Sequence, residues 1–173
     1  MNKTMNIALI SIAIGILVFG LKYWAYWITG SVALFSDALE STVNVATALV
    51  AFFAIRVAAI PEDENHPYGH HKAELMSATL EGALIVIAAL VILWQAYFAF
   101  MAPRPLTDVT AGLTINVLAS VISGVWCYYL LREGRKLQSP ALVADGKHLL
   151  TDVSSSLGII LGITLAIWSG LRW

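Results

Sequence analysis

The stretch that decides the fold is Pro140–Trp168, PALVADGKHLLTDVSSSLGIILGITLAIW, an apolar run that carries the ionisable residues Asp145, His148 and Asp152 near its middle. About 20 apolar residues suffice for a helix to cross a bilayer, and this run exceeds that length. An ionisable side chain at bilayer depth costs about 2.5–3.5 kcal/mol on insertion scales. Three of them on one membrane-spanning helix therefore indicate a role that offsets this cost.

The spacing of these residues suggests what that role is. His148 and Asp152 are four residues apart, so they lie one turn apart on the same helix face, and Asp145, three residues before His148, lies on the same stripe. An imidazole and a carboxylate placed in this way can bind a single divalent cation. The pattern therefore indicates a metal site inside a membrane helix.

The composition agrees with a membrane protein. The chain is 59% hydrophobic and 12% charged, with a mean hydropathy of +0.79, whereas soluble domains carry about 25% charged residues. The net charge of −1 indicates no nucleic-acid partner. Cys127 is the only cysteine, which excludes a disulfide or a cysteine-based zinc site within one chain.

We expect an all-α fold, a polytopic membrane helix bundle of about five transmembrane helices that forms a single transmembrane domain over residues 1–173. All five prolines lie between the expected spans or at the start of the last one, where a missing N–H does least harm. The expected spans are roughly Ile7–Ile28, Val32–Arg56, Ala73–Phe100, Thr110–Leu131 and Pro140–Trp168.

The basic residues predict how the bundle is oriented. One side of the spans carries Lys3, Arg56, Lys72, Arg132, Arg135 and Lys136, and the other carries Arg104 and Arg172. Because cytoplasmic loops are enriched in Lys and Arg, the amino terminus and the loops at 57–72 and 132–139 are expected to be cytoplasmic. We expect an integral protein of a bacterial inner membrane.

The second span repeats the polar spacing of the fifth. In both, an Asp is followed by a polar residue three positions on and by another four positions further: Asp37, Glu40, Asn44 and Asp145, His148, Asp152. The two helices run in opposite directions, so a rise of about 1.5 Å per residue puts Glu40 level with Asp152 and Asn44 level with His148. These four residues are predicted to form one site at the membrane midplane. The alternative is that they only bond the two helices together.

Three stretches resemble the transmembrane domain of the cation diffusion facilitators. They are Gly30–Leu39 (GSVALFSDAL), Asn65–Glu74 (NHPYGHHKAE) and Ala144–Asp152 (ADGKHLLTD). The resemblance runs from about Lys22 to Gly162. Members of that family exchange divalent metal ions for protons, so the resemblance implies an efflux transporter and not an enzyme, with the metal as cargo and no cofactor.

The resemblance also implies which residues bind the metal. By position, Glu40, Asn44, His148 and Asp152 are the ligands, and Asp37 and Asp145 are accessory. The family commonly has Asp or His followed by Asp at the first two positions, so Glu40 and Asn44 depart from its pattern and lower the charge of the site by one. The family norm is six spans followed by a cytoplasmic metal-binding domain. This chain stops after five, so we expect no C-terminal cytoplasmic domain in it.

The loop before the third span is a second candidate metal site. Asp63, His66 and His70 are spaced so that they could hold Zn²⁺, at positions where some members of the family bind a loop metal. The alternative is a solvated turn whose acids and histidines only keep the loop in water. Two other polar residues have simpler expected roles: Lys22 snorkels to the outer interface, and Glu81 pairs with a cation, with a role in relaying protons as the alternative.

The ligand set limits the choice of transported ion. Zn²⁺ is the leading ion, but one imidazole with carboxylate and amide oxygens also suits Mn²⁺, Fe²⁺, Co²⁺ or Ni²⁺. The expected partners are divalent metal ions, protons, the lipid bilayer and a second copy in a homodimer. A different class remains open, because His66, His70 and His71 fit one histidine box of the membrane di-iron desaturases. Those enzymes carry about eight histidines, and this chain has four. A membrane scaffold or an inactive subunit is the third alternative.

Overall fold

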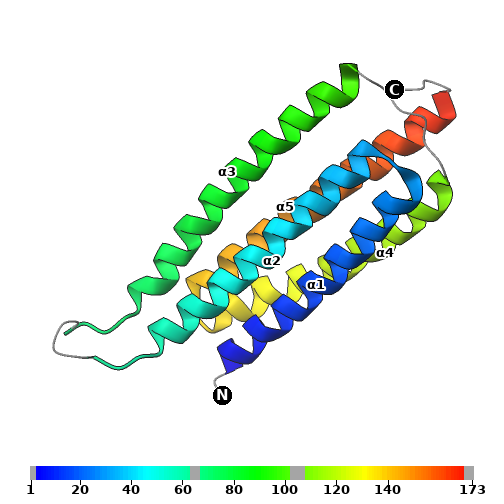
Figure 1. The fold of residues 1–173 in the computed structure, drawn as a ribbon. Helices are drawn as coiled ribbons and strands as arrows, with labels where there is room; N and C mark the ends of the chain where they lie inside the picture. The colour runs from blue at the N-terminus through cyan, green and yellow to red at the C-terminus, as the bar shows by residue number, and fades with distance from the viewer. Residues whose placement is uncertain (1–2, 63–66, 102–107, 170–173) are drawn as a thin grey trace.

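A computed structural model describes residues 3–62, 67–101 and 108–169. This part of the chain forms five α-helices and no strand (Figure 1). Each helix is long and apolar enough to cross a membrane. The helices are α1 (Lys3–Thr29), α2 (Val32–Ala58), α3 (Lys72–Met101), α4 (Val109–Lys136) and α5 (Pro140–Ser169). The all-α membrane bundle expected from the sequence is confirmed, and the helix ends lie within a few residues of the predicted ones.

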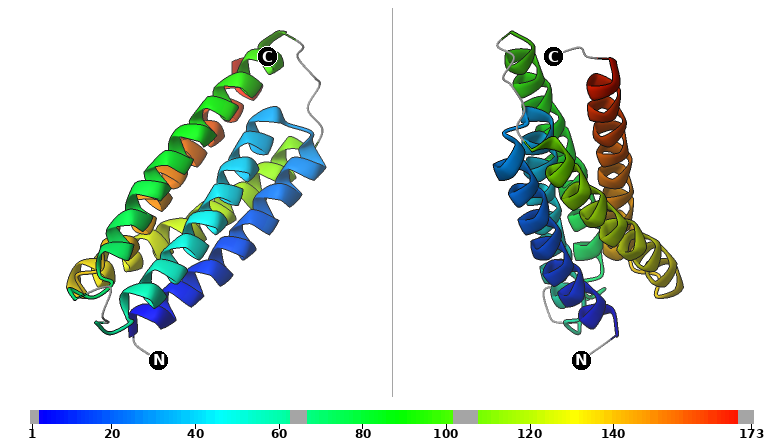
Figure 2. Two further views of the ribbon diagram at one scale, coloured as in Figure 1. Left: turned by 60° about the vertical axis from the view of Figure 1, so that its left-hand side comes forward. Right: turned by 90° about the vertical axis from the view of Figure 1, so that its right-hand side faces the viewer.

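Four of the helices form a ring, and α3 covers one side of it. Within the ring α1 packs on α2 and α4, and α5 packs on α2 and α4. The remaining helix, α3, packs on α2 and α5 and lies outside the ring (Figures 1 and 2). The α1–α2 turn lies at the opposite end of the bundle from the amino terminus. Residues on α2 and α5 can therefore meet in the interior of the bundle.

The connections at the ends of α2 and α5 explain where those helices start. Gly30 has a φ of +64°, a conformation that favours glycine, and it closes the short turn after α1. Ser31 caps α2 by accepting from the Leu34 N–H at 3.5 Å. At the start of α5, Pro140 occupies the first helical position, where its missing N–H costs nothing. The Ser139 hydroxyl donates to Glu74 of α3, which ties α3 to α5.

Apolar packing is concentrated towards the two ends of the bundle. One cluster includes Ile7, Ile55, Leu130 and Leu142, and a smaller one includes Ala25, Leu34 and Ile163. Between them the interior is polar. The buried polar residues of α2 and α5 here are Asp37, Glu40, Ser41, Asn44, Thr47, Asp145, His148, Asp152 and Ser156. The apolar clusters enclose this polar layer, which makes its residues the candidates for function.

At Gly112, α4 lies closer to α1 than at the other described glycines of α4. A Cβ at this position would lie 2.1 Å from Thr29 Cγ2 and 3.1 Å from the Ala25 carbonyl oxygen. The Thr29 hydroxyl already donates to the Ala25 carbonyl at 2.9 Å, so the side chain is held in place. The two backbones can approach this closely because residue 112 has no side chain.

We expect Gly112→Ala to lower the free energy of unfolding by about 1–3 kcal/mol, because the added methyl group forces α1 and α4 apart. Thermal unfolding of the detergent-solubilised chain measures this. Gly158→Ala is the matched control, since a Cβ there meets nothing within 4 Å. Equal losses of stability in the two variants would contradict the close approach at Gly112.

Candidate metal centre

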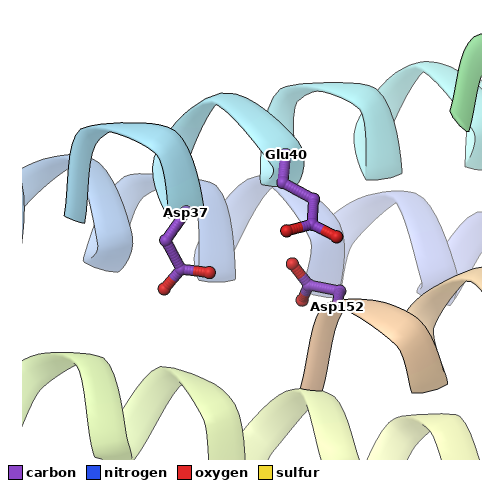
Figure 3. A group of neighbouring side chains, drawn as sticks. All are labelled: Asp37, Glu40 and Asp152. Carbon is purple, nitrogen blue, oxygen red and sulfur yellow. The ribbon is translucent and has the colours of Figure 1, made fainter. Parts of the chain in front are cut away.

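Three acidic side chains meet in the interior between α2 and α5. One carboxylate oxygen from each of Asp37, Glu40 and Asp152 lies within 4.8 Å of the others. Asp37 and Asp152 are fully buried, and Glu40 is 9% exposed. Figure 3 shows the Glu40 and Asp152 carboxylates facing each other from the two helices. Among the described residues, this is the one group of three or more acids, histidines or cysteines close enough to share a metal ion.

The helix geometry explains this meeting. Asp37 and Glu40 are three residues apart on α2, so both point to the side on which α5 packs. The helix rise predicted that Glu40 and Asp152 lie at the same depth, and in the structure their carboxylate oxygens lie within 4.8 Å of each other. Glu40 is also held by the Ser155 hydroxyl, which donates to its carboxylate at 2.7 Å.

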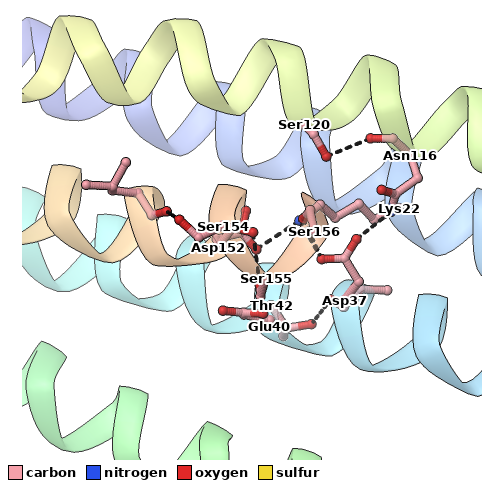
Figure 4. Close-up of polar contacts among 12 residues, drawn as sticks. Lys22, Asp37, Glu40, Thr42, Asn116, Ser120, Asp152, Ser154, Ser155 and Ser156 are labelled. Carbon is pink, nitrogen blue, oxygen red and sulfur yellow. Dashed lines mark hydrogen bonds and ion pairs between the residues drawn. The ribbon is translucent and has the colours of Figure 1, made fainter. Parts of the chain in front are cut away.

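Lys22 of α1 lies in the same cluster, and the expectation that it snorkels to the interface is wrong. Its side chain is fully buried. The ammonium group donates to Asp37 at 2.9 Å, to Asp152 at 2.8 Å and to the Ser156 hydroxyl at 2.9 Å (Figure 4). A buried charge is costly unless it is paired, and two buried carboxylates pair this one.

The two carboxylates beside Lys22 have different surroundings. Asp37 also accepts from the Ser156 hydroxyl at 2.8 Å and from the Asn116 side chain of α4. Asp152 accepts from Lys22 through Oδ1, whereas its Oδ2 has no hydrogen-bond partner among the described residues. Asp37 is therefore fixed by three helices, while Asp152 keeps one buried oxygen free for another ligand.

Asn44 and His148 are buried without hydrogen bonds. They are 5% and 3% exposed. The Asn44 amide approaches the Asp152 carboxylate but makes no hydrogen bond of ordinary geometry with a described residue, and neither ring nitrogen of His148 has a partner within the described ranges. Buried polar groups without partners are uncommon, and each calls for an explanation such as a missing ion or water. Both residues therefore have the free donor atoms that a metal ligand needs.

The two residues line different cavities. His148 lies on the wall of a cavity of about 460 Å³ between α3 and α5, together with Glu81 of α3. Asn44 lines a cavity of about 10 Å³, large enough for about one water molecule, with Asp145 and Ser123. His148 is not part of the group that Asp37, Glu40 and Asp152 form. The structure thus brings Glu40 and Asp152 together, with Asn44 next to the Asp152 carboxylate and His148 apart, and the ligand assignment stays a prediction.

The remaining candidates fall into three groups. Asp145, 4% exposed, accepts from the Ser11 hydroxyl of α1 at 2.7 Å. Glu81 accepts from Ser77 at 3.1 Å and forms no ion pair with a described residue, so the expected cation pairing is wrong. Of the loop site, Asp63 and His66 lie outside the described residues. His70 is partly buried at the start of α3, and that site stays a prediction.

Four members of the cluster were not predicted from the sequence as site residues: Lys22, Asn116, Ser155 and Ser156. Charge balance is the signal that could have identified Lys22, since several buried acids on α2 and α5 require a cation nearby. No comparable signal marks Asn116, whose contact with Asp37 depends on how α4 packs in the ring.

Comparison with known proteins supports the same interpretation. The family model described as the cation efflux transmembrane domain matches residues 8–173. An uncharacterized transporter of Synechocystis, sll1263, is 46% identical over 166 residues, which are 96% of this chain and 54% of that protein. The cation-efflux pump FieF of Yersinia pestis is 30% identical over 165 residues, 95% of this chain and 55% of the pump.

The chain spans about half the length of these relatives. Members of the matched family are transporters and not enzymes, so the di-iron desaturase alternative is set aside. The match covers nearly the whole chain and agrees with its five apolar helices and with the motifs in α2, α5 and the loop before α3. The chain belongs to the cation efflux family, the cation diffusion facilitators.

Proposed function

We propose that this chain is the membrane-spanning part of a divalent-cation efflux transporter that exchanges a metal ion, with Zn²⁺ as the leading candidate, for protons. The observation that carries the proposal is the buried group of Asp37, Glu40 and Asp152 between two membrane-crossing helices. Ionisable side chains at this depth are costly and are characteristic of ion pathways. The FieF pumps, named as cation-efflux proteins, are relatives over this region.

The proposed ligands are Glu40, Asn44, His148 and Asp152. The free Oδ2 of Asp152 and the unbonded donor atoms of Asn44 and His148 favour this set. Lys22 and Asp37 form a neutral ion pair, so two ionised ligands, Glu40 and Asp152, balance the charge of a divalent ion. Because the imidazole and the oxygens also suit Mn²⁺, Fe²⁺, Co²⁺ or Ni²⁺, these ions are the alternatives within the same function.

The route to the site is proposed to run through the cavity between α3 and α5. His148 lies on its wall, and Lys147 and Thr151 of α5 line it as well. Apart from Lys22 and Lys147, the basic residues of the described helices, including Lys3, Arg56 and Lys136, lie at or near helix ends, and these ends are on the amino-terminal side of the bundle (Figure 1). By the positive-inside rule, this side is proposed to face the cytoplasm of a bacterial inner membrane.

Two further proposals come from the family resemblance. The chain is proposed to act as a homodimer, which light scattering of the purified protein in detergent would test. Asp63, His66 and His70 are proposed as a second metal site in the loop between α2 and α3. Histidine substitutions in this loop, measured for zinc stoichiometry, would test it separately from the site inside the bundle.

We expect the apparent Zn²⁺ affinity of the chain to fall as the pH is lowered from 8 to 5.5. A histidine or carboxylate must lose its proton to bind a metal, so protons compete with the ion and acid weakens binding. This competition also couples metal release to proton entry. Isothermal titration at several pH values measures the affinity, and vesicle uptake with a panel of ions identifies the preferred metal. Affinity that stays flat over this range would rule out a titrating ligand and with it the exchange mechanism.

A further inference from the structure

Lys22 is the one residue of the buried cluster that neither metal binding nor helix packing alone explains. It is the largest fully buried side chain of the described residues. A lysine ammonium has three N–H donors, and Asp37, Asp152 and Ser156 take all three at 2.8–2.9 Å (Figure 4). The chain therefore holds a cation of its own against the carboxylates proposed to bind the transported ion.

The position of the ammonium conflicts with full use of Asp152 as a ligand. Lys22 occupies Oδ1 of Asp152, while a divalent ion bound by the same carboxylate would lie within a few ångströms of the ammonium. Two cations that close repel each other strongly in an interior of low dielectric constant. The metal ion and the Lys22 ammonium thus cannot both be bound to Asp152 at full strength.

After leaving Asp152, the ammonium can stay hydrogen-bonded to Asp37 and Ser156. Asp37 is held by Asn116 and Ser156 in addition to Lys22, so it does not depend on the lysine for its position. The lysine stem is flexible, and a small movement takes its ammonium off Asp152 while it keeps Asp37. With all three carboxylates ionised and Lys22 charged, the cluster has a net charge of −2, which a divalent ion neutralises.

We propose that Lys22 is a tethered cation that competes with the transported ion for Asp152. When a metal ion binds, the ammonium leaves Asp152 and keeps its bonds to Asp37 and Ser156, and when the ion leaves it bonds to Asp152 again. The lysine keeps its charge throughout. This inference rests on the proposed function. Its consequence is weaker metal binding than the bare carboxylates would give, which allows the ion to be released.

The first test compares Lys22→Gln with Lys3→Gln, by isothermal titration of Zn²⁺ at one fixed pH. Glutamine still donates a hydrogen bond but carries no charge, so Lys22→Gln is expected to bind Zn²⁺ at least ~10-fold more tightly and to release it more slowly. Lys3 is a lysine of the same helix, but its side chain is 62% exposed and pairs with Glu133. Lys3→Gln is expected to match the wild-type chain. Unchanged or weaker binding by folded Lys22→Gln would overturn the proposal.

The second test uses Asp37→Asn and does not depend on whether Lys22→Gln folds. With its anchoring carboxylate neutralised, the ammonium is left to Asp152, so Asp37→Asn alone is expected to weaken Zn²⁺ binding at least ~10-fold. In the Lys22→Gln background the same change removes only the direct attraction of the Asp37 charge for the ion, so the loss is expected to be smaller. Unchanged affinity in Asp37→Asn, or an equal loss in both backgrounds, would instead make Asp37 inert or a direct ligand and would overturn the competition.

Asp152→Ala separates the failure of this inference from the failure of the proposed function. Loss of Zn²⁺ binding in Asp152→Ala, together with no gain in Lys22→Gln, removes the competition and leaves the metal site intact as a proposal. Normal Zn²⁺ binding in Asp152→Ala removes the site itself, and the competition fails with it.

Discussion

Asp152→Ala is expected to abolish divalent-cation transport while the protein remains inserted and folded. Asp152 is fully buried, one of its carboxylate oxygens has no hydrogen-bond partner among the described residues, and it lies in the same group as Glu40. Substitution of groups that merely support metal ligands already costs about 10–100-fold, so loss of a ligand should weaken Zn²⁺ binding by more than ~100-fold. The fold is expected to persist because Lys22 keeps Asp37 as its ion partner.

Uptake of Zn²⁺ into vesicles that contain the purified chain measures this effect, with thermal unfolding as the test of folding. His148→Ala is expected to give the same loss of binding, since neither ring nitrogen of His148 has a hydrogen-bond partner in the described part of the chain. Ser154→Ala is the matched control on α5, because its exposed hydroxyl bonds only to the helix backbone at Leu150. Transport near the wild-type rate in both Asp152→Ala and His148→Ala would remove these residues from the site.

Asn44→Asp is expected to tighten Zn²⁺ and Cd²⁺ binding by about tenfold or more and to slow their release. The amide of Asn44 is neutral, so the ionised ligands Glu40 and Asp152 give the site a charge of −2. A carboxylate at position 44 makes that charge −3, so the new acid either strengthens the attraction for the ion or holds a proton that the ion must displace. One additional proton should then be released for each metal ion bound.

Titration in a weakly buffered solution counts the protons released, and thermal unfolding reports stability. The competing interpretation is that Asn44 belongs to the small polar cavity near Asp145 and Ser123 and does not reach the metal. In that case a new buried acid would mainly destabilise the bundle. A stable Asn44→Asp chain with unchanged metal preference and proton count would remove Asn44 from the ligand set.

The helices of this protein could be predicted almost completely from the sequence. Apolar runs long enough to cross a bilayer are separated by prolines and polar loops, and both signals are local. That Glu40 and Asp152 lie at the same depth was also predictable, because a fixed rise per residue converts sequence position into depth. Depth is set by the position of a residue along its own helix, so no knowledge of packing was required.

The lateral arrangement of the helices could not be obtained in the same way. Lys22 lies seven residues before the end of α1, from where a long side chain can reach the interface, so snorkelling was a reasonable expectation. Its burial against Asp37 and Asp152 depends on the packing of α1 beside α2 in a ring closed by α5. Glu81 likewise lines a cavity and forms no ion pair with a described residue, because of where α3 packs.

Zinc K-edge X-ray absorption of the chain loaded with one equivalent of Zn²⁺ tests most directly whether the ion binds inside the helix bundle. The zinc is expected to have one imidazole and otherwise oxygen ligands at about 2.0–2.2 Å, with the imidazole contribution lost in His148→Ala. Three of the four histidines, His66, His70 and His71, lie in the loop between α2 and α3. Two or more imidazoles on the zinc, unchanged in His148→Ala, would place the ion in that loop and contradict a site inside the bundle.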